Sequence, residues 1–225
     1  MNSKKIIGVL GGMGHACTVH FLQLLVEYQQ KVLHCVQDGE FYKSIIYNTA
    51  LEEWNNTGFV NLESVKEQLL KEIKRLDDFG CDVIVVPCNT VHHFYLDMKN
   101  AVKTPMISII EETSKRAIES GIKKVGILCS KSTRELELYK KYLDIEILYP
   151  LEQDLIDAII EDVQAGRNEA FDAIMLNGIM QEMINDGAEA IIVGCTELSI
   201  PLKNSILPIY DSSKILCEAL FKEIE

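Results

Sequence analysis

Two cysteines in similar surroundings are the residues of this sequence best suited to chemistry. Cys88 follows the apolar run VIVVP and precedes an Asn-Thr pair, while Cys195 follows AIIVG and precedes Thr-Glu. A short β-branched run that ends in polar residues is typical of a strand leading into a functional loop. The pattern predicts that both thiols lie at the carboxyl ends of strands, where open α/β sheets bind ligands.

Two thiols on opposite sides of one carbon atom can invert its configuration. Inversion needs one base to remove a proton and a conjugate acid on the other face to supply one. A free thiol has a pKa of about 8.5, so little thiolate exists at pH 7 unless the site favours it. We expect helices to begin after Cys88 and Cys195, because their N–H groups would stabilise both a thiolate and a substrate carboxylate.

Short strand-like runs alternate with longer segments of helical period along the whole chain. This alternation predicts parallel sheets that are covered by helices on both faces. The expected strands are 5–10, 44–48, 82–86, 106–109, 125–129, 146–148, 190–193 and 207–209. The clearest helical spacing of apolar residues falls in 62–76 and 155–163.

An internal repeat divides the chain into two similar halves. GCDVIVVPCNT at 80–90 aligns without a gap with GAEAIIVGCTE at 187–197, which pairs Gly80 with Gly187 and Asp82 with Glu189. KKIIGVLGG and KKVGILCS resemble each other in the same way at the start of each half. The predicted fold class is therefore α/β, with two similar open parallel-sheet domains, an approximate two-fold axis and a cleft between them.

Composition limits the classes of partner. With 34 acidic and 22 basic residues the net charge is −12, which makes nucleic acid and anionic membrane surfaces poor partners. Apolar runs are of strand length, well below the ~18 residues of a membrane span. The seven cysteines are scattered and odd in number, and the first apolar run is too short for a signal peptide, so we expect a cytoplasmic protein.

Six motifs give the chain a family resemblance over nearly its whole length. IGVLGGMG, PCNTVHHFY, ISIIEET, VGILCSKST, VGCTEL and PIYDSSKIL resemble the aspartate/glutamate racemase family, and its aspartate racemase branch above all. The resemblance implies a cofactor-independent amino-acid racemase, an isomerase that uses no PLP and no metal. Its catalytic residues would be Cys88 and Cys195, one acting as thiolate base and the other as thiol acid.

The resemblance also implies substrate contacts and an assembly. Residues that match the family's substrate-binding positions are Gly12, Met13, Asn48, Asn89, Thr90, Ser130, Thr133, Thr196 and Glu197. Family members are commonly homodimers, and their C-terminal helix returns to the first domain. We therefore expect one domain of residues 1–103 plus 211–225 and a second of residues 104–210.

Two departures from the family pattern remove positive charge. The loop YNTALEEWNNTGF lacks the arginine that would hold a substrate's side-chain carboxylate, and Gln164 stands where members often carry lysine. Such a pairing contributes roughly a few kcal/mol in a desolvated pocket. We hypothesise a substrate with a neutral or cationic side chain near Glu52 or Glu53, unless Arg134 or Arg167 approaches from another direction.

Other activities remain open at this stage. A decarboxylase or cis-trans isomerase of the same superfamily would depend mainly on one cysteine, and a binding protein would tolerate the loss of either. Dinucleotide binding is disfavoured because GGMGHAC lacks the last glycine of GxGxxG. A zinc site at Cys88, His92 and His93 would lack a fourth ligand. For His92 we expect a role in orienting the site, and for His93 a packed or surface position.

The remaining cysteines are expected to be buried apolar residues, because a free cysteine commonly packs as a small hydrophobe. They are Cys17, Cys35, Cys81, Cys129 and Cys217.

Overall fold

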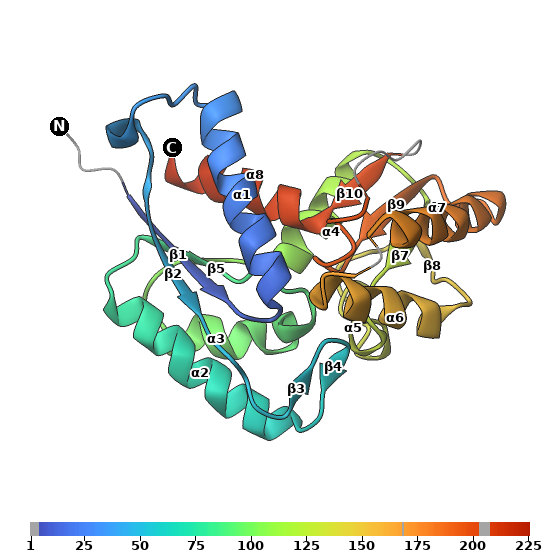
Figure 1. Cartoon of the computed structure of the whole chain (residues 1–225), viewed down its shortest axis with the longest axis horizontal. Helices are drawn as coiled ribbons and strands as arrows, with labels where there is room; N and C mark the ends of the chain where they lie inside the picture. The colour runs from blue at the N-terminus through green and yellow to red at the C-terminus, as the bar shows by residue number, and fades with distance from the viewer. Residues whose placement is uncertain (1–4, 168, 203–207) are drawn as a thin grey trace.

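Two four-stranded parallel sheets form the frame of the molecule (Figure 1). The computed structural model describes residues 5–167, 169–202 and 208–225. The first sheet has the strand order β2-β1-β5-β6, and the second has the order β10-β9-β7-β8. Taken from opposite edges, the two orders are the same, so the predicted α/β fold with two similar parallel sheets is confirmed.

The strands and helices alternate as the sequence pattern indicates. The first sheet contains β1 (Ile6–Gly11), β2 (Lys43–Asn48), β5 (Val83–Val85) and β6 (Met106–Ile107). The second contains β7 (Lys124–Leu128), β8 (Glu146–Leu148), β9 (Ala190–Val193) and β10 (Ile209–Asp211). The longer helices are α1 (His15–Lys31), α2 (Leu62–Asp78), α4 (Ile109–Glu119), α6 (Gln153–Gln164), α7 (Glu169–Asn185) and α8 (Ser212–Ile224). Shorter elements are η1 (Asp38–Glu40), β3 (Trp54–Asn55), β4 (Gly58–Phe59), η2 (Thr90–Phe94), α3 (Tyr95–Ala101) and α5 (Lys131–Glu135).

Two expected strands differ from their predicted ends by two residues, whereas the others differ by at most one. The strand predicted over 106–109 stops at Ile107, because the Ser108 side chain accepts the Glu111 N–H at 3.2 Å and begins α4. The strand predicted over 207–209 is found at Ile209–Asp211, and residue 207 lies outside the described residues. The antiparallel β3–β4 hairpin was not predicted.

The sheet pairing bears on the expected domain boundary. β6 pairs with β5 through Ile84 with Met106 and Val85 with Ile107, so it belongs to the first sheet. The boundary expected between residues 103 and 104 would therefore separate β6 from the sheet to which it is hydrogen-bonded. The division into a domain of 1–103 plus 211–225 and another of 104–210 stays a prediction.

The acidic residues that the repeat pairs, Asp82 and Glu189, make equivalent hydrogen bonds in the two halves. Asp82 accepts the backbone N–H of Ile6 at 2.6 Å, and Glu189 accepts that of Lys124 at 3.1 Å. The glycine two positions before each acid has a positive φ, 77° in one half and 95° in the other, which turns the chain from helix into strand. The repeat thus fixes how each cysteine-bearing strand enters its sheet.

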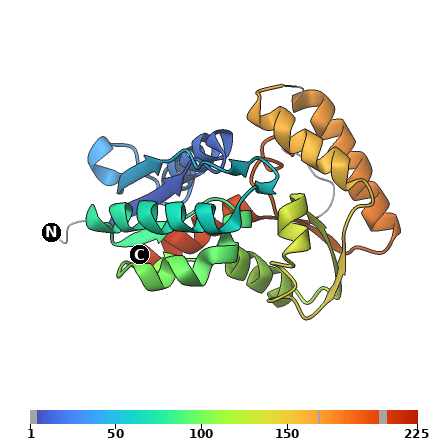
Figure 2. The same cartoon turned by 90° about the horizontal axis from the view of Figure 1, so that it is seen from below.

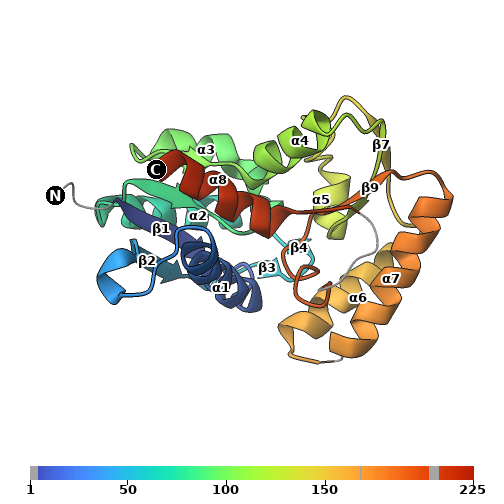
Figure 3. The ribbon, with the colours of Figure 1, turned by 90° about the horizontal axis from the view of Figure 1, so that it is seen from above.

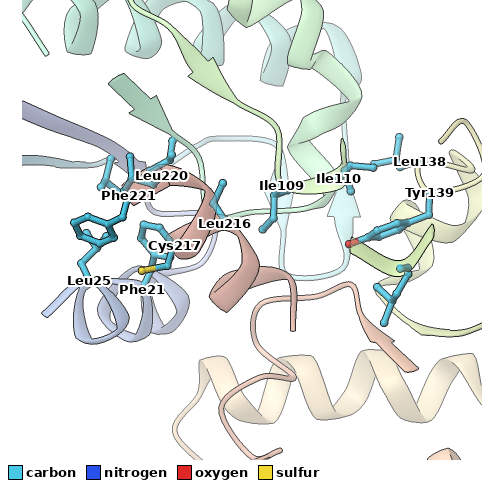
Figure 4. Close-up of a cluster of buried hydrophobic side chains, with 14 of the residues drawn as sticks. Phe21, Leu25, Ile109, Ile110, Leu138, Tyr139, Leu216, Cys217, Leu220 and Phe221 are labelled. Atoms are coloured by element: carbon cyan, nitrogen blue, oxygen red, sulfur yellow. The ribbon is translucent and has the colours of Figure 1, made fainter. Parts of the chain in front are cut away.

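One apolar cluster runs between the two sheets (Figure 4). It begins where Phe21 of α1 packs with Phe221 of α8, continues through Ile109 of α4 and reaches Tyr139 beside the second sheet. Tyr28 stacks on Phe221 with ring centroids 4.5 Å apart. Figure 3 shows α8 lying beside α1. The two halves therefore share buried surface rather than meeting only at their edges.

The outer face of each sheet is covered by its own helices. α2 and α3 pack on the first sheet through a second apolar cluster that includes Leu69, Ile73 and Met98. α6 and α7 cover the second sheet, where Ile160 and Leu176 belong to a third cluster. Figure 2 shows the α6–α7 pair at the end of the molecule away from the chain termini. Among the described residues, none of the helices is both long and apolar enough to cross a lipid bilayer.

Candidate active site

A cavity lies where the carboxyl ends of β1, β5 and β9 meet the β3–β4 hairpin. Its described lining residues are Met13, Gly14, Trp54, Asn56, Cys88, Asn89, Thr90, Cys195, Thr196 and Glu197. Each predicted catalytic thiol reaches it from a different sheet.

The structure brings most of the predicted site residues together. Both cysteines line the cavity with Met13, Asn89, Thr90, Thr196 and Glu197. Of the other four, Gly12 lies behind the lining, where its N–H donates to Thr18 Oγ1 at 2.9 Å. Asn48 Nδ2 contacts His15 Nδ1 at 2.8 Å on the exposed side of the site.

Ser130 and Thr133 support the lining from behind. Ser130 caps α5 by accepting the Thr133 N–H at 3.3 Å. Their hydroxyl groups lie 3.0 Å and 2.8 Å from Thr90 Oγ1, which comes from the other half of the chain. Because these contacts join the halves, the two hydroxyls fix the position of Thr90.

Two partners that the sequence pattern did not indicate hold Asn89. The Tyr139 hydroxyl donates to Asn89 Oδ1 at 2.7 Å, and Asn89 Nδ2 donates to Ser212 Oγ at 3.1 Å. The Asn89 side chain is buried, and both ends of its amide are bonded. Ser212 at least belongs to the PIYDSSKIL motif, whereas nothing in the local sequence marks Tyr139.

Cys88 is buried beside backbone donors. Burial and the Glu197 charge raise the pKa of the Cys88 thiol to about 12, although the N–H groups of Val91 and Thr90 act in the opposite direction. A 3-10 helix, η2, begins at Thr90, so the expected helical turn after Cys88 is present in a tighter form. Cys88 is therefore a thiol at neutral pH.

His92 supports the backbone of Cys88. Its Nε2 accepts the Ile109 N–H at 3.2 Å, which leaves a proton on Nδ1 to donate to the Cys88 carbonyl at 2.7 Å. Burial lowers the pKa of His92 to about 4, so the ring is neutral. Both ring nitrogens are occupied, and no group of three or more His, Cys, Asp or Glu side chains among the described residues could hold a metal ion.

Cys195 is bonded to a buried carboxylate. Its thiol donates to Glu197 Oε2 at 3.1 Å, and the Thr196 hydroxyl contacts the same oxygen at 3.2 Å. Burial, together with the Glu197 charge, raises the pKa of Cys195 well above its usual value. The prediction of a helix after Cys195 is wrong, because turns follow through Pro201.

A third thiol approaches the same carboxylate. Cys17 lies in the first turn of α1 and is buried, as expected, but its thiol is close enough to the Glu197 carboxylate to be affected by that charge. Burial and the Glu197 charge raise the pKa of Cys17 well above its usual value. Of the other cysteines, Cys35 is only half-buried, contrary to expectation, and its thiol donates to the Glu40 carbonyl at 3.1 Å.

The charged residues that we considered as possible contacts of the substrate side chain lie outside the cavity. Glu52 and Glu53 are exposed and do not line it. Arg134 donates to the Pro150 carbonyl at 3.1 Å, and Arg167 is paired with an aspartate of its own region. Among the described lining residues only Glu197 carries a formal charge. Trp54 and Asn56, which the β3–β4 hairpin places in the wall, were not predicted.

The buried thiols make the fold sensitive to alkali. Burial raises the pKa of six thiols above the unfolded value of about 8.5; they are Cys17, Cys81, Cys88, Cys129, Cys195 and Cys217. A raised pKa in the folded state stabilises the protein below the unfolded pKa, and this contribution is lost as the pH rises above it. We expect the free energy of unfolding, measured by urea denaturation under reducing conditions, to fall steadily above about pH 8.5. A value that stays constant up to about pH 10 would contradict this.

Comparisons with known proteins agree with this geometry. The family described as Asp/Glu/Hydantoin racemase matches residues 10–220. The broad specificity amino-acid racemase RacX of Bacillus subtilis is 27% identical over 220 residues, covering 95% of this chain and 96% of that protein. A Picrophilus torridus aspartate racemase superposes with a TM-score of 0.79 at 27% identity, covering 98% of this chain and 94% of the other. An aspartate racemase homologue from Pyrococcus horikoshii OT3 gives a TM-score of 0.79 at 25% identity, covering 98% and 99%.

Proposed function

Because this chain belongs to the Asp/Glu/Hydantoin racemase family, we propose that it is a cofactor-independent amino-acid racemase in which Cys88 and Cys195 act on opposite faces of the α-carbon. Family membership makes racemisation, an isomerase reaction, its class of activity. The observation that carries the two-thiol proposal is that equivalent positions of the two repeated sheets supply one thiol each to a single cavity.

The proposed reaction removes one proton from the α-carbon and adds another to its opposite face. A thiolate removes the α-proton, so a Cα–H bond breaks and an S–H bond forms. The opposite thiol then gives its proton to the other face of the carbon and becomes the thiolate. The reverse direction exchanges the two roles, which is why a symmetric pair of thiols suits it. Asn89, Thr90 and Thr196 are the proposed contacts of the substrate carboxylate.

The site must generate a thiolate, because the raised pKa values of Cys88 and Cys195 keep both protonated at neutral pH. Glu197 Oε2 lies 3.1 Å from the Cys195 sulfur and is placed to accept its proton. A substrate ammonium group entering beside this carboxylate would add a positive charge, which favours the thiolate form. Glu197 therefore serves both the thiol and the amino group of the substrate.

The preferred substrate has an uncharged side chain. No lysine or arginine is among the described lining residues, so a second carboxylate would be desolvated without a cation. The exposed positions of Glu52 and Glu53 remove the reason to expect a cationic side chain. The hairpin instead presents Trp54 and Asn56, and the broad specificity that names the Bacillus subtilis relative supports this proposal.

A substrate panel tests this specificity. We expect kcat/KM for neutral amino acids such as alanine and methionine to exceed that for aspartate by about 100-fold, because an unpaired carboxylate costs a few kcal/mol. The rates come from chiral chromatography of both enantiomers. Asn56→Arg places a cation in the wall and should narrow the difference, while Val60→Arg, at an exposed position outside the cavity, should not. Efficient turnover of aspartate by the unmodified protein would refute the preference.

The family resemblance also supports assembly as a homodimer, and we infer one here. All seven thiols are free, which suits the reducing cytoplasm that we propose as the compartment. The net charge of −12 favours a small-molecule substrate over nucleic acid or anionic membrane surfaces as partner. Analytical ultracentrifugation at several protein concentrations measures the assembly directly, and a monomer at every concentration would contradict the dimer.

A further inference from the structure

Gln164 joins three segments around the cavity although it is not among the described lining residues. It is the last residue of α6, whose apolar face is fixed in the third cluster. Its Nε2 donates to Glu197 Oε1 at 2.6 Å, and its Oε1 accepts the Ala16 N–H at 3.4 Å. A Cβ atom on Gly14 would lie 1.4 Å from Nε2, so only glycine leaves room for this amide.

Among the described residues, no cation is paired with the buried carboxylate that Gln164 holds. Glu197 is 5% exposed, and its carboxylate is hydrogen-bonded to Gln164, Cys195 and Thr196. A buried carboxylate without an ion pair depends on neutral donors for its orientation. The amide contact at 2.6 Å is shorter than the contacts of Cys195 and Thr196 with this carboxylate, and it is the one made to Oε1.

We propose that Gln164 is a positioning residue for proton transfer at Cys195, an inference that rests on the proposed function. By bonding to Oε1, the amide leaves Oε2 directed at the Cys195 sulfur. In the step, the S–H bond of Cys195 breaks, an O–H bond forms on Glu197 Oε2 and the sulfur becomes the thiolate. A neutral amide orients the carboxylate while leaving it free to accept that proton.

Gln164→Met removes the amide and keeps a side chain of similar length. Because Gln164 does not line the cavity, kcat is expected to fall about 10- to 100-fold while KM changes less than about threefold. Gln153→Met is the matched control: it lies at the other end of α6, is also half-buried and donates to the Cys129 carbonyl at 3.0 Å. A Gln164→Met variant that keeps more than half of kcat, or that raises only KM, overturns the proposal.

A swap variant separates positioning from structural support. Combining Gln164→Glu with Glu197→Gln keeps one amide bonded to one carboxylate, so the contact between the segments is retained. The carboxylate, however, is moved away from Cys195. We expect the double variant to recover the thermal stability of the unmodified protein but to remain as inactive as Glu197→Gln alone. Recovery of racemisation together with stability would show that the contact is only structural.

Alkylation of Cys195 gives a readout that does not depend on turnover. The titratable groups facing Cys195 are Glu197, Cys17 and Cys88. Gln164→Glu adds a further carboxylate, so the pH midpoint for iodoacetamide labelling of Cys195, followed by peptide mass spectrometry, should rise by about one unit or more. Gln153→Glu should leave it unchanged.

The kcat values and the labelling midpoint together distinguish failure of the proposed function from failure of the positioning role. If the unmodified protein does not racemise amino acids but Gln164→Glu moves the midpoint, the placement of Gln164 beside the thiol stands and the proposed function fails. If the protein does racemise, while Gln164→Met keeps its kcat and Gln164→Glu leaves the midpoint unchanged, the positioning role alone fails.

Discussion

Replacing either Cys88 or Cys195 by serine is expected to reduce racemisation by at least about 10³-fold, since each change removes one of the two proton-transfer groups. A serine hydroxyl occupies nearly the same space but has a far higher pKa than a thiol. It therefore supplies neither the base on one face nor the matched acid on the other. Chiral chromatography of the product measures the loss.

Buried cysteines elsewhere provide the control for this experiment. Cys129→Ser and Cys217→Ser change thiols of similar burial that do not line the cavity, so both variants should retain activity if they fold. Circular dichroism confirms folding in each case. Activity that depends on one cavity cysteine but not the other would favour the one-cysteine isomerase or decarboxylase, and binding without turnover in the unmodified protein would favour a binding protein.

Glu197→Gln is expected to move two measurements in opposite directions. The Glu197 charge contributes to raising the pKa of Cys17, Cys88 and Cys195, so its removal should speed iodoacetamide labelling of the two cavity cysteines at neutral pH. Racemisation should nevertheless fall by about 10²- to 10⁴-fold, the range typical of losing a positioned acid or base. If the Glu197 charge only opposed thiolate formation, Glu197→Gln would speed up racemisation as well as labelling.

Glu72→Gln serves as the matched control for that variant. Glu72 is also a buried carboxylate, hydrogen-bonded to Tyr47 and Arg75, but it lies on α2 outside the cavity. It should change stability without changing the labelling of Cys88 or Cys195. A Glu197→Gln variant with unchanged racemisation would exclude the carboxylate from proton transfer.

The sheets and the thiols could be predicted because both depend on local pattern. The repeat around Gly80 and Gly187 reports a turn and a buried strand, and each of these is set by neighbouring residues. The same regularity placed Cys88 and Cys195 at equivalent strand ends. The prediction of a helix after Cys195 failed because the residues that follow form turns. The Glu197 carboxylate is bonded to neighbouring residues there.

The residues that were missed reach the site from distant segments. Tyr139 contacts Asn89 and Gln164 contacts Glu197 only because the halves pack together, and no local spacing records such contacts. The sequence predicts that Cys17 packs as an apolar residue of its helix, and only the folded structure shows that it lies near the Glu197 carboxylate. Trp54 enters the wall through a hairpin whose strands have two residues each, too short to show an alternating pattern.

The initial fate of deuterium in D2O tests the two-thiol account most directly. One enantiomer of a turned-over amino acid is incubated with the reduced protein without added cofactor, and substrate and product are separated and analysed by mass spectrometry at low conversion. Two groups on opposite faces predict that the product enantiomer carries deuterium at the α-carbon while the recovered substrate does not. Equal labelling of both enantiomers, or a product that keeps the original proton, would show that a single group acts and would contradict the account.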